Sequence, residues 1–383
     1  VLTPNRAHMV HDVYEVTVNN VPEIIAHGDT GQDTAFLVDS EANDVFVAGA
    51  HYASMRALDN AYRNETKGFE IVTGNAVMGG YDLGVLIDSS GNDHFRVLPE
   101  FSQMFGGGSE LRASRFEQFT AHHRVGGDDL VEFVDSAGDD LFRANMDSAT
   151  MRGDGFENRV EGFHDVRANA TRGGNDVAEL YDSPADDEFV ASHDQATLSG
   201  PGFSNQVRNF DITSGYSVLG GNDIARLRDS VGDDVFVGRG TYSELRGDGF
   251  KNRANGFAQV IADATAGGND LALMLDVSGI DWFTSQSTSA AMRSESSTYE
   301  NVVRHFETVR ATSDNSENVA EFDDVESTEM LMGRNSMAHL GGAERDVFAT
   351  GFGVVNATAK TGETAQADIH NVDFVFSQFG DWS

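Results

Sequence analysis

Short stretches of alternating apolar and polar residues run through most of the chain. Within residues 163–209, the stretches 166–170, 178–180 and 189–191 each place an apolar side chain at every second position. Gly, Asp, Asn and Pro separate these stretches, and all four are typical of tight turns. Alternation bounded by turn residues predicts short β-strands with one buried face. Because residues 163–209 show no 3.6-residue apolar period, the pattern predicts an all-β protein.

The pattern returns at a fixed interval of 47 residues. Five positions keep this spacing through five copies, which indicates an internal repeat. They are Phe69, Phe116, Phe163, Phe210 and Phe257; Asp82, Asp129, Asp176, Asp223 and Asp270; Asp88, Asp135, Asp182, Asp229 and Asp276; Asp93, Asp140, Asp187, Asp234 and Asp281; and Phe95, Phe142, Phe189, Phe236 and Phe283. An earlier copy has Asp33, Asp39, Asp44 and Phe46, displaced by 49 residues, and a later one begins near Phe306, also after 49.

Strands that recur at a fixed interval predict a right-handed parallel β-solenoid, or β-helix, of about seven to eight 47-residue repeats. A β-propeller is the alternative, because its blades have about 40–50 residues. The turns are Asp/Gly-rich, and the Trp-Asp and Gly-His signatures of propeller blades are missing, which favours the solenoid. We expect residues 1–30 to form an N-terminal end or cap, 31–310 the repeats, and 311–383 degenerate repeats with a C-terminal cap.

Charge narrows the range of functions. The chain has 62 Asp and Glu against 26 Lys and Arg, a net charge of −36. This balance argues against nucleic acid as a partner, since phosphate backbones are bound by basic side chains. No apolar run approaches the roughly 18 residues of a membrane helix, so no membrane span is expected. With no cysteine, disulfides and thiolate chemistry are excluded.

Two acidic turn motifs alternate within each repeat. One is GGND or GGDD, as at 173–176, and the other is a D-S-x-G-D-D run, as at 135–140. If equivalent aspartates lie one or two rungs apart, at ~4.8 or ~9.6 Å, each pair repels by about 3.5 or 1.7 kcal/mol at a dielectric of about 20. Asp182 also shares the alternation phase of the core residues Ala178 and Leu180. Inward carboxylates need a cation or several backbone N–H donors. We therefore expect Ca²⁺, with N–H-capped corners and monovalent salt as alternatives.

These turns resemble the calcium-binding nonapeptide (RTX) β-roll, whose pattern is G-G-x-G-x-D-x-U-x. Across about 30–283 the unit is also similar to Asp/Gly-rich repeats of large secreted or cell-surface proteins of aquatic bacteria. GGND lacks the third glycine, so the ligand set does not transfer as a whole. Asp129, Asp176, Asp223 and Asp270 match the acid after the glycine pair, and Asp140, Asp187, Asp234 and Asp281 match the acid before the apolar strand. The resemblance implies an extracellular, calcium-stiffened structural module.

The full set of aspartates expected to bind Ca²⁺ follows the repeat registers. It comprises Asp33, Asp39, Asp44, Asp82, Asp88, Asp93, Asp129, Asp135, Asp140, Asp176, Asp182, Asp187, Asp223, Asp229, Asp234, Asp270, Asp276 and Asp281.

An active site, if the chain has one, should lie where the repeat is broken, and the clearest break is His122-His123-Arg124. In the next copy these positions are Asn169, Ala170 and Thr171, so His123 replaces a small core-phase residue. A histidine, an arginine and a nearby carboxylate such as Asp128 are a candidate set for proton abstraction beside a uronate. The simpler interpretation is a surface histidine pair, and the spacing fixes no third ligand for a metal.

We therefore expect a non-catalytic structural or adhesive repeat protein that is secreted or at the cell surface and stiffened by Ca²⁺. Its expected partners are further copies of itself, through end-to-end or lateral assembly, or an extracellular glycan. The alternatives are a secreted polysaccharide lyase or hydrolase, with its site near His122 to Asp129, and a glycan-binding module in which Ca²⁺ bridges to the sugar. A surface of −36 repels acidic glycans unless bound cations neutralise it.

Overall fold

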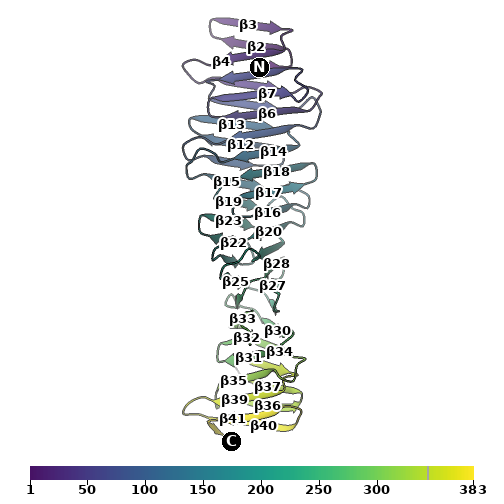
Figure 1. Ribbon diagram of the computed structural model, residues 1–383. Coiled ribbons are helices and arrows are strands. Elements are labelled where there is room, and N and C mark those ends of the chain that lie inside the picture. Colours follow the sequence, from purple (N-terminus) through teal and green to yellow (C-terminus); the bar gives the residue numbers. More distant parts are fainter. Residues whose placement is uncertain (343–344) are drawn as a thin grey trace. The chain divides into compact units, whose positions relative to one another are not determined.

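The computed structural model describes residues 1–342 and 345–383, and every regular element in this part of the chain is a β-strand. The strands wind into stacked coils whose walls are hydrogen-bonded sheets (Figure 1). The predicted β-solenoid is therefore confirmed. The β-propeller alternative is wrong, because strands of successive repeats pair with one another instead of forming separate blades. No described segment forms a helix long and apolar enough to cross a membrane.

Each repeat folds into five strands, which we call a group. In the group at 118–161, β14 and β18 pair in parallel in one sheet, and β15 lies in the opposite sheet. β16, β17 and β18 form an antiparallel meander, so the solenoid is not purely parallel. The strands are β14 (Gln118–His122), β15 (Leu130–Val134), β16 (Leu141–Ala144), β17 (Ser148–Gly153) and β18 (Phe156–Glu161).

Among the described residues, seven groups are complete. The two before β14 are β4 (Glu23–His27), β5 (Thr34–Val38), β6 (Asp44–Gly49), β7 (Tyr52–Ala57) and β8 (Arg63–Lys67); and β9 (Ile71–Asn75), β10 (Leu83–Ile87), β11 (His94–Val97), β12 (Phe101–Gly106) and β13 (Ser109–Ser114).

The four groups after β18 are β19 (Asp165–Asn169), β20 (Val177–Tyr181), β21 (Glu188–Ala191), β22 (Gln195–Gly200) and β23 (Phe203–Arg208); β24 (Ile212–Tyr216), β25 (Ile224–Arg228), β26 (Val235–Gly238), β27 (Tyr242–Gly247) and β28 (Phe250–Asn255); β29 (Gln259–Asp263), β30 (Leu271–Leu275), β31 (Asp281–Gln286), β32 (Ser289–Ser294) and β33 (Glu300–Arg304); and β34 (Thr308–Thr312), β35 (Val319–Val325), β36 (Met330–Asn335), β37 (Met337–Gly341) and β38 (Asp346–Thr350).

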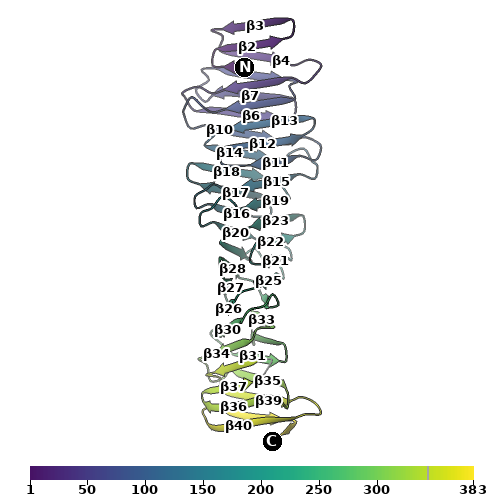
Figure 2. The ribbon, with the colours of Figure 1, turned by 180° about the vertical axis from the view of Figure 1, so that it is seen from behind.

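Other strands lie at the two ends of the chain. They are β1 (Leu2–Thr3), β2 (Arg6–His11) and β3 (Tyr14–Asn19), and then β39 (Val354–Ala359), β40 (Thr364–Val372), β41 (Val375–Phe379) and β42 (Asp381–Trp382). β2 and β3 form an antiparallel hairpin, and β39 and β40 pair in parallel with β35 and β36 (Figure 2). A complete group thus begins at Glu23, within the predicted cap at 1–30, and the last one ends at Thr350, within the predicted degenerate segment at 311–383.

Contacts divide the chain into two compact units. One consists of residues 1–180 and 202–210, and the other of 181–201 and 211–383. Both contain the same five-strand arrangement. In the first unit β16–β18 form a meander, and in the second β26–β28 do so.

Equivalent strands of successive groups lie in opposite sheets. β14 and β19 begin 47 residues apart, but β14 pairs with β10 and β18, whereas β19 pairs with β15 in the other sheet. Parallel neighbours such as Leu130 and Asp165 are therefore only 35 residues apart. The expectation that equivalent aspartates lie above one another, one or two rungs apart, is wrong, because equivalent strands of successive repeats lie in opposite sheets.

The core between the sheets is built from the two phenylalanine registers of the repeat. Phe142 is fully buried, and its ring lies 6.2 Å from that of Phe210. Phe95 and Phe163 make the same contact at 4.9 Å, as do Phe189 and Phe257 at 6.0 Å. The apolar period thus supplies the aromatic core, in which phenylalanines of one register contact those of the other.

Candidate functional site

The two acidic motifs meet at the corners between the sheets. The D-S-x-G-D-D turn of one repeat lies against the GGND turn of the next. The Asp140 amide donates to Asp176 Oδ1 at 2.8 Å, and the Asn175 amide donates to Asp139 Oδ1 at 2.9 Å. The first of these contacts recurs at 2.7–2.8 Å in the pairs Asp44–Asp82, Asp93–Asp129, Asp187–Asp223 and Asp234–Asp270.

The second glycine of GGND is required by this contact. Gly174 has φ +113°, and a Cβ built on it would lie 2.2 Å from the carbonyl oxygen of Gly138 in the neighbouring turn. Gly173 also has a positive φ, +97°, but a Cβ there meets nothing within 4 Å. One glycine is therefore needed for its backbone angle alone, and the other also for close approach of two backbones.

Nearly all the predicted aspartates gather in clusters of three. Each cluster joins two acids of a D-S-x-G-D-D turn to the acid of the next GGND turn, and every one of these acids except the half-buried Asp276 is buried. The clusters are Asp39, Asp44 and Asp82; Asp88, Asp93 and Asp129; Asp135, Asp140 and Asp176; Asp182, Asp187 and Asp223; Asp229, Asp234 and Asp270; and Asp276 and Asp281 with Asn318 as the third member. Asp33 stands apart from them, and its carboxylate accepts from the Asp29 amide at 2.9 Å.

Backbone and hydroxyl donors compensate part of this buried charge. Asp135 Oδ2 accepts from the amides of Thr171 and Arg172 at 2.8 and 2.7 Å. Asp140 Oδ2 accepts from the amide and the hydroxyl of Ser136 at 2.7 and 2.8 Å. Hydrogen bonds of this kind stabilise the ionised form of a carboxyl group. N–H-capped corners, one of the alternatives expected from the sequence, are therefore present.

The donors do not reach every oxygen. Five of the clusters contain a buried Oδ1 atom with no hydrogen-bond partner among the described residues, and such an atom costs about 1–3 kcal/mol or more when it is charged. These atoms belong to Asp39 and Asp44, which share a cluster, and to Asp88, Asp140, Asp182 and Asp234.

Burial also acts on the titration of the clusters. Loss of solvent, together with the neighbouring carboxylates of Asp39 and Asp44, raises the pKa of Asp82 to about 6. Burial likewise raises the pKa of Asp270 to about 6, with Glu307 as its most important acidic neighbour. The clusters therefore gain stability from a bound proton or a bound cation.

An acidic residue lies at the start of the third strand in these groups. Its side chain faces a position at the beginning of the fifth strand, and the residue type at that position differs between groups. In two groups Asp140 and Asp234 face Phe156 and Phe250, across Gly153 and Gly247. Tyr299 occupies this position for Asp281 and donates its hydroxyl to Asp281 Oδ1 at 2.8 Å. Tyr62 occupies it beside Asp44.

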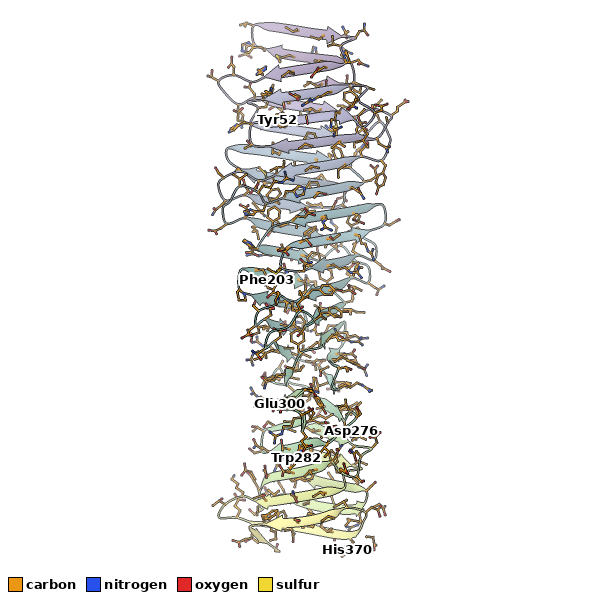
Figure 3. The ribbon with its side chains drawn as sticks, in the orientation of Figure 1. Tyr52, Phe203, Asp276, Trp282, Glu300 and His370 are labelled. Atoms are coloured by element: carbon orange, nitrogen blue, oxygen red, sulfur yellow. The ribbon has the colours of Figure 1, made fainter. Side chains whose placement is uncertain are left out.

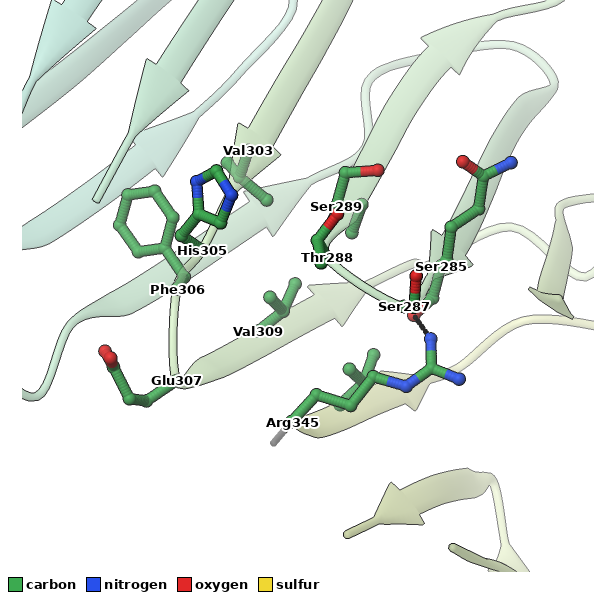
Figure 4. Close-up of a pocket in the computed structure, with 13 residues that line it drawn as sticks. Ser285, Ser287, Thr288, Ser289, Val303, His305, Phe306, Glu307, Val309 and Arg345 are labelled. Carbon is green, nitrogen blue, oxygen red and sulfur yellow. Dashed lines mark hydrogen bonds between the residues drawn. The ribbon is translucent and has the colours of Figure 1, made fainter. Parts of the chain in front are cut away.

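In the last complete group the same register holds an ion pair. Glu329 replaces the aspartate, and Arg345 binds it through Nε and Nη2 at 2.6 and 3.0 Å. Arg345 lines a pocket of about 220 Å³ with Ser285 and His305 (Figure 4). Because its guanidinium already binds Glu329 through two nitrogens, the pocket offers no uncompensated cation for an anionic ligand.

The candidate catalytic residues do not form one constellation. Successive residues of the strand point to opposite sides, so His122 contacts Glu161 at 3.1 Å on the outer face. Burial and the nearby Arg124, which is exposed, lower the pKa of His122. His123 instead points into the corner, where its Nδ1 lies 2.6 Å from Asp129 Oδ2 and 3.2 Å from Asp88 Oδ2.

Other unrepeated residues lie on the outer faces of the strands. Trp282 is half-buried on β31, opposite Arg293 of β32 (Figure 3). His94 contacts Glu132 on the neighbouring strand at 2.9 Å. Each directly follows a cluster aspartate in the chain, Asp93 or Asp281, but lies on the outer face of its strand, so both are variable positions of the solenoid wall.

Sequence reasoning missed a register of buried asparagines. Asn158, Asn205 and Asn252 keep the 47-residue spacing, and the Nδ2 of each donates to a backbone carbonyl 60 residues earlier in the chain. Their recurrence at inward positions of a strand was the available signal. We also compared the sequence with models of known protein families and with curated proteins, and neither comparison gave a match.

Proposed function

We propose that this chain is a non-catalytic structural repeat module of a secreted or cell-surface protein, with Ca²⁺ compensating the acidic corners. The observation that carries the proposal is the unpartnered, buried carboxylate oxygen that recurs in five clusters. These oxygens belong to two registers of the same corner, and buried charge that recurs from corner to corner calls for a recurrent counter-charge. The residues that keep the repeat spacing serve the corners and the core, which favours a structural role.

Calcium suits these corners better than other common ions. It accepts six to eight oxygen ligands from carboxylates, carbonyl groups and water in flexible geometries. The corners offer aspartate oxygens together with turn carbonyl groups such as that of Gly138. Since no three aspartates among the described residues bring their oxygens within 4.8 Å of one another, carbonyl or water oxygens would complete the coordination. Bound cations would also reduce the self-repulsion of a chain with net charge −36.

The proposed partners are further copies of the chain or an extracellular glycan reached through bound Ca²⁺. An acidic surface repels uronate or sulfated polymers, and a bridging divalent cation removes that repulsion. The catalytic alternative has less support, because His122 and His123 point to opposite sides and Arg124 lies with His122.

Thermal unfolding followed by circular dichroism tests the calcium proposal. Each site stabilises by RT ln(1 + [L]/Kd), about 2.7 kcal/mol at a hundredfold excess over Kd, so several sites should raise the midpoint by tens of degrees over EGTA at equal ionic strength. Asp223→Asn is a matched variant, because Asn318 naturally accepts the equivalent amide from Asp281. It should fold and show a smaller calcium shift. An unchanged wild-type midpoint in Ca²⁺ and EGTA would refute the proposal.

A further inference from the structure

One corner differs from all the others in its chemistry. Asp88, His123 and Asp129 form the only set of three His, Asp or Glu residues in the described chain whose candidate ligand atoms all lie within 4.8 Å of one another. The side chains of Asp88 and Asp129 are 0 and 2% exposed, and that of His123 is 20% exposed. Asp88 follows β10, His123 follows β14 and Asp129 precedes β15, so neighbouring turns bring the three together.

The fold does not require an imidazole at this corner, because the equivalent corners of other groups form without one. At the positions equivalent to His123, the next two groups have Ala170 and Ser217. Ser217 donates its hydroxyl to Asp223 Oδ2 at 2.7 Å, which shows that this position is aimed at the acid of the GGND turn. His123 thus replaces a small side chain with a nitrogen ligand directed at two carboxylates.

Hydrogen bonding alone leaves this corner incompletely compensated. Nδ1 carries at most one proton, yet it faces Asp129 Oδ2 at 2.6 Å and Asp88 Oδ2 at 3.2 Å. Asp88 Oδ1 is buried and has no hydrogen-bond partner among the described residues. Asp88 is therefore a buried, partly unsatisfied carboxylate directed at the imidazole, independent evidence that a further cation belongs in this cluster.

The corner is also accessible. A pocket of about 330 Å³ is lined by His123, Asp128 and Asp129 together with His164 and Asp165. His164 is exposed, and its ring centroid lies 5.9 Å from that of His123. The pocket provides an entry path for an ion and room for the water molecules that complete its coordination.

The ligand set distinguishes the ion. Imidazole nitrogen favours Zn²⁺ and other first-row divalent metals, whereas Ca²⁺ prefers oxygen ligands only. A tetrahedral ion with bonds of about 2.0–2.1 Å holds its ligand atoms about 3.3 Å apart. The separation of His123 Nδ1 from Asp88 already has nearly this value, and the separation from Asp129 needs to open by about 0.7 Å. We propose that Asp88, His123 and Asp129 bind a first-row divalent metal ion such as Zn²⁺.

Metal content after dialysis against Zn²⁺ tests the proposal on the full chain. The protein is first freed of metal, then dialysed against Zn²⁺ in excess Ca²⁺ and measured by elemental analysis. Wild type should retain one Zn²⁺ more than His123→Ala, a variant that reproduces the alanine of the next repeat. His122→Ala is the control and should retain as much as wild type, because His122 points away from the corner.

Equal Zn²⁺ content in wild type and His123→Ala under these conditions would overturn the proposal. Circular dichroism of the metal-free variants checks that each is folded. The zinc site does not depend on the proposed structural role. His123→Ala leaves the other clusters intact, so their response to Ca²⁺ succeeds or fails separately.

Discussion

At the scale of single residues, a buried acid recurs at the start of the third strand, but the residue that contacts it differs from group to group. Asp281 receives a hydrogen bond from Tyr299, and Glu329 pairs with Arg345. Asp234 faces the ring edge of Phe250 instead, and its Oδ1 has no hydrogen-bond partner among the described residues. The register thus contains compensated and uncompensated versions of the same site.

This comparison predicts the effect of adding one hydroxyl group. Phe250→Tyr should raise the free energy of unfolding by about 1 kcal/mol in metal-free buffer, because it supplies a donor for the unpartnered Asp234 oxygen. Phe203→Tyr is the control, since Asp187 Oδ1 already accepts from the Ser183 hydroxyl at 3.2 Å. Urea denaturation of both variants measures the difference. Equal effects, or a loss of stability in Phe250→Tyr alone, would contradict this account.

At the scale of elements, the stacked turns and the hairpin loops set the repeat length. Most hairpins between the fourth and fifth strands have a two-residue loop, as at 154–155 between Gly153 and Phe156. The loops at 58–61 and 295–298 have two residues more, and they precede Tyr62 and Tyr299. The two intervals of 49 residues therefore mark longer loops that carry tyrosine in place of phenylalanine.

The stacked turns predict unequal roles for the two glycines of GGND. Gly173→Ala should cost about 1–2 kcal/mol, because a Cβ strains a positive φ. Gly174→Ala should cost clearly more, because its Cβ also meets the Gly138 carbonyl oxygen of the next turn. Chemical denaturation under identical conditions compares them. If the two variants lose the same stability, close approach of the turns is not what selects the second glycine.

At the scale of the whole molecule, buried carboxylates occur in both units of a highly acidic chain. Burial raises the pKa of Asp39, Asp82, Asp93, Asp140, Asp223, Asp270 and Asp276. The folded protein therefore binds more protons than the unfolded chain between about pH 4 and 6. Burial of His122 acts in the opposite direction, since it lowers the pKa of that group.

The sign of the pH dependence follows from this balance. Where the folded state binds more protons, the free energy of unfolding increases as the pH falls. The melting temperature of the metal-free protein should therefore rise between pH 7 and 5, with the largest change near the pKa of about 6 of Asp82 and Asp270.

Bound Ca²⁺ keeps carboxylates ionised, so adding it should shrink or reverse the rise. Circular dichroism at constant ionic strength measures the slope, and the double variant Asp82→Asn with Asp270→Asn should flatten it. A melting temperature that falls steadily below pH 7 without metal would show that protons do not compensate these corners.

The sequence by itself determined the strands, the repeat and the burial of the aspartates. Period-two alternation identifies which side chains face inward, and Asp182 is fully buried, as its phase indicates. Fixed spacing then predicted repeated units of one design that bury their apolar faces against one another, and favoured a solenoid over a β-propeller. These properties are local or periodic, so one chain is enough to read them.

Only the tertiary structure decided which residues meet. Each group crosses between the sheets three times, as at β14 to β15, β15 to β16 and β18 to β19. Because this number is odd, equivalent strands of successive groups lie in opposite sheets. The residues that meet at a corner therefore occupy different positions within the 47-residue repeat. Asp88 and His123, 35 residues apart, thus become partners although no 47-residue comparison pairs them. Alternation in the sequence specifies a buried face, but strand pairing specifies its neighbours.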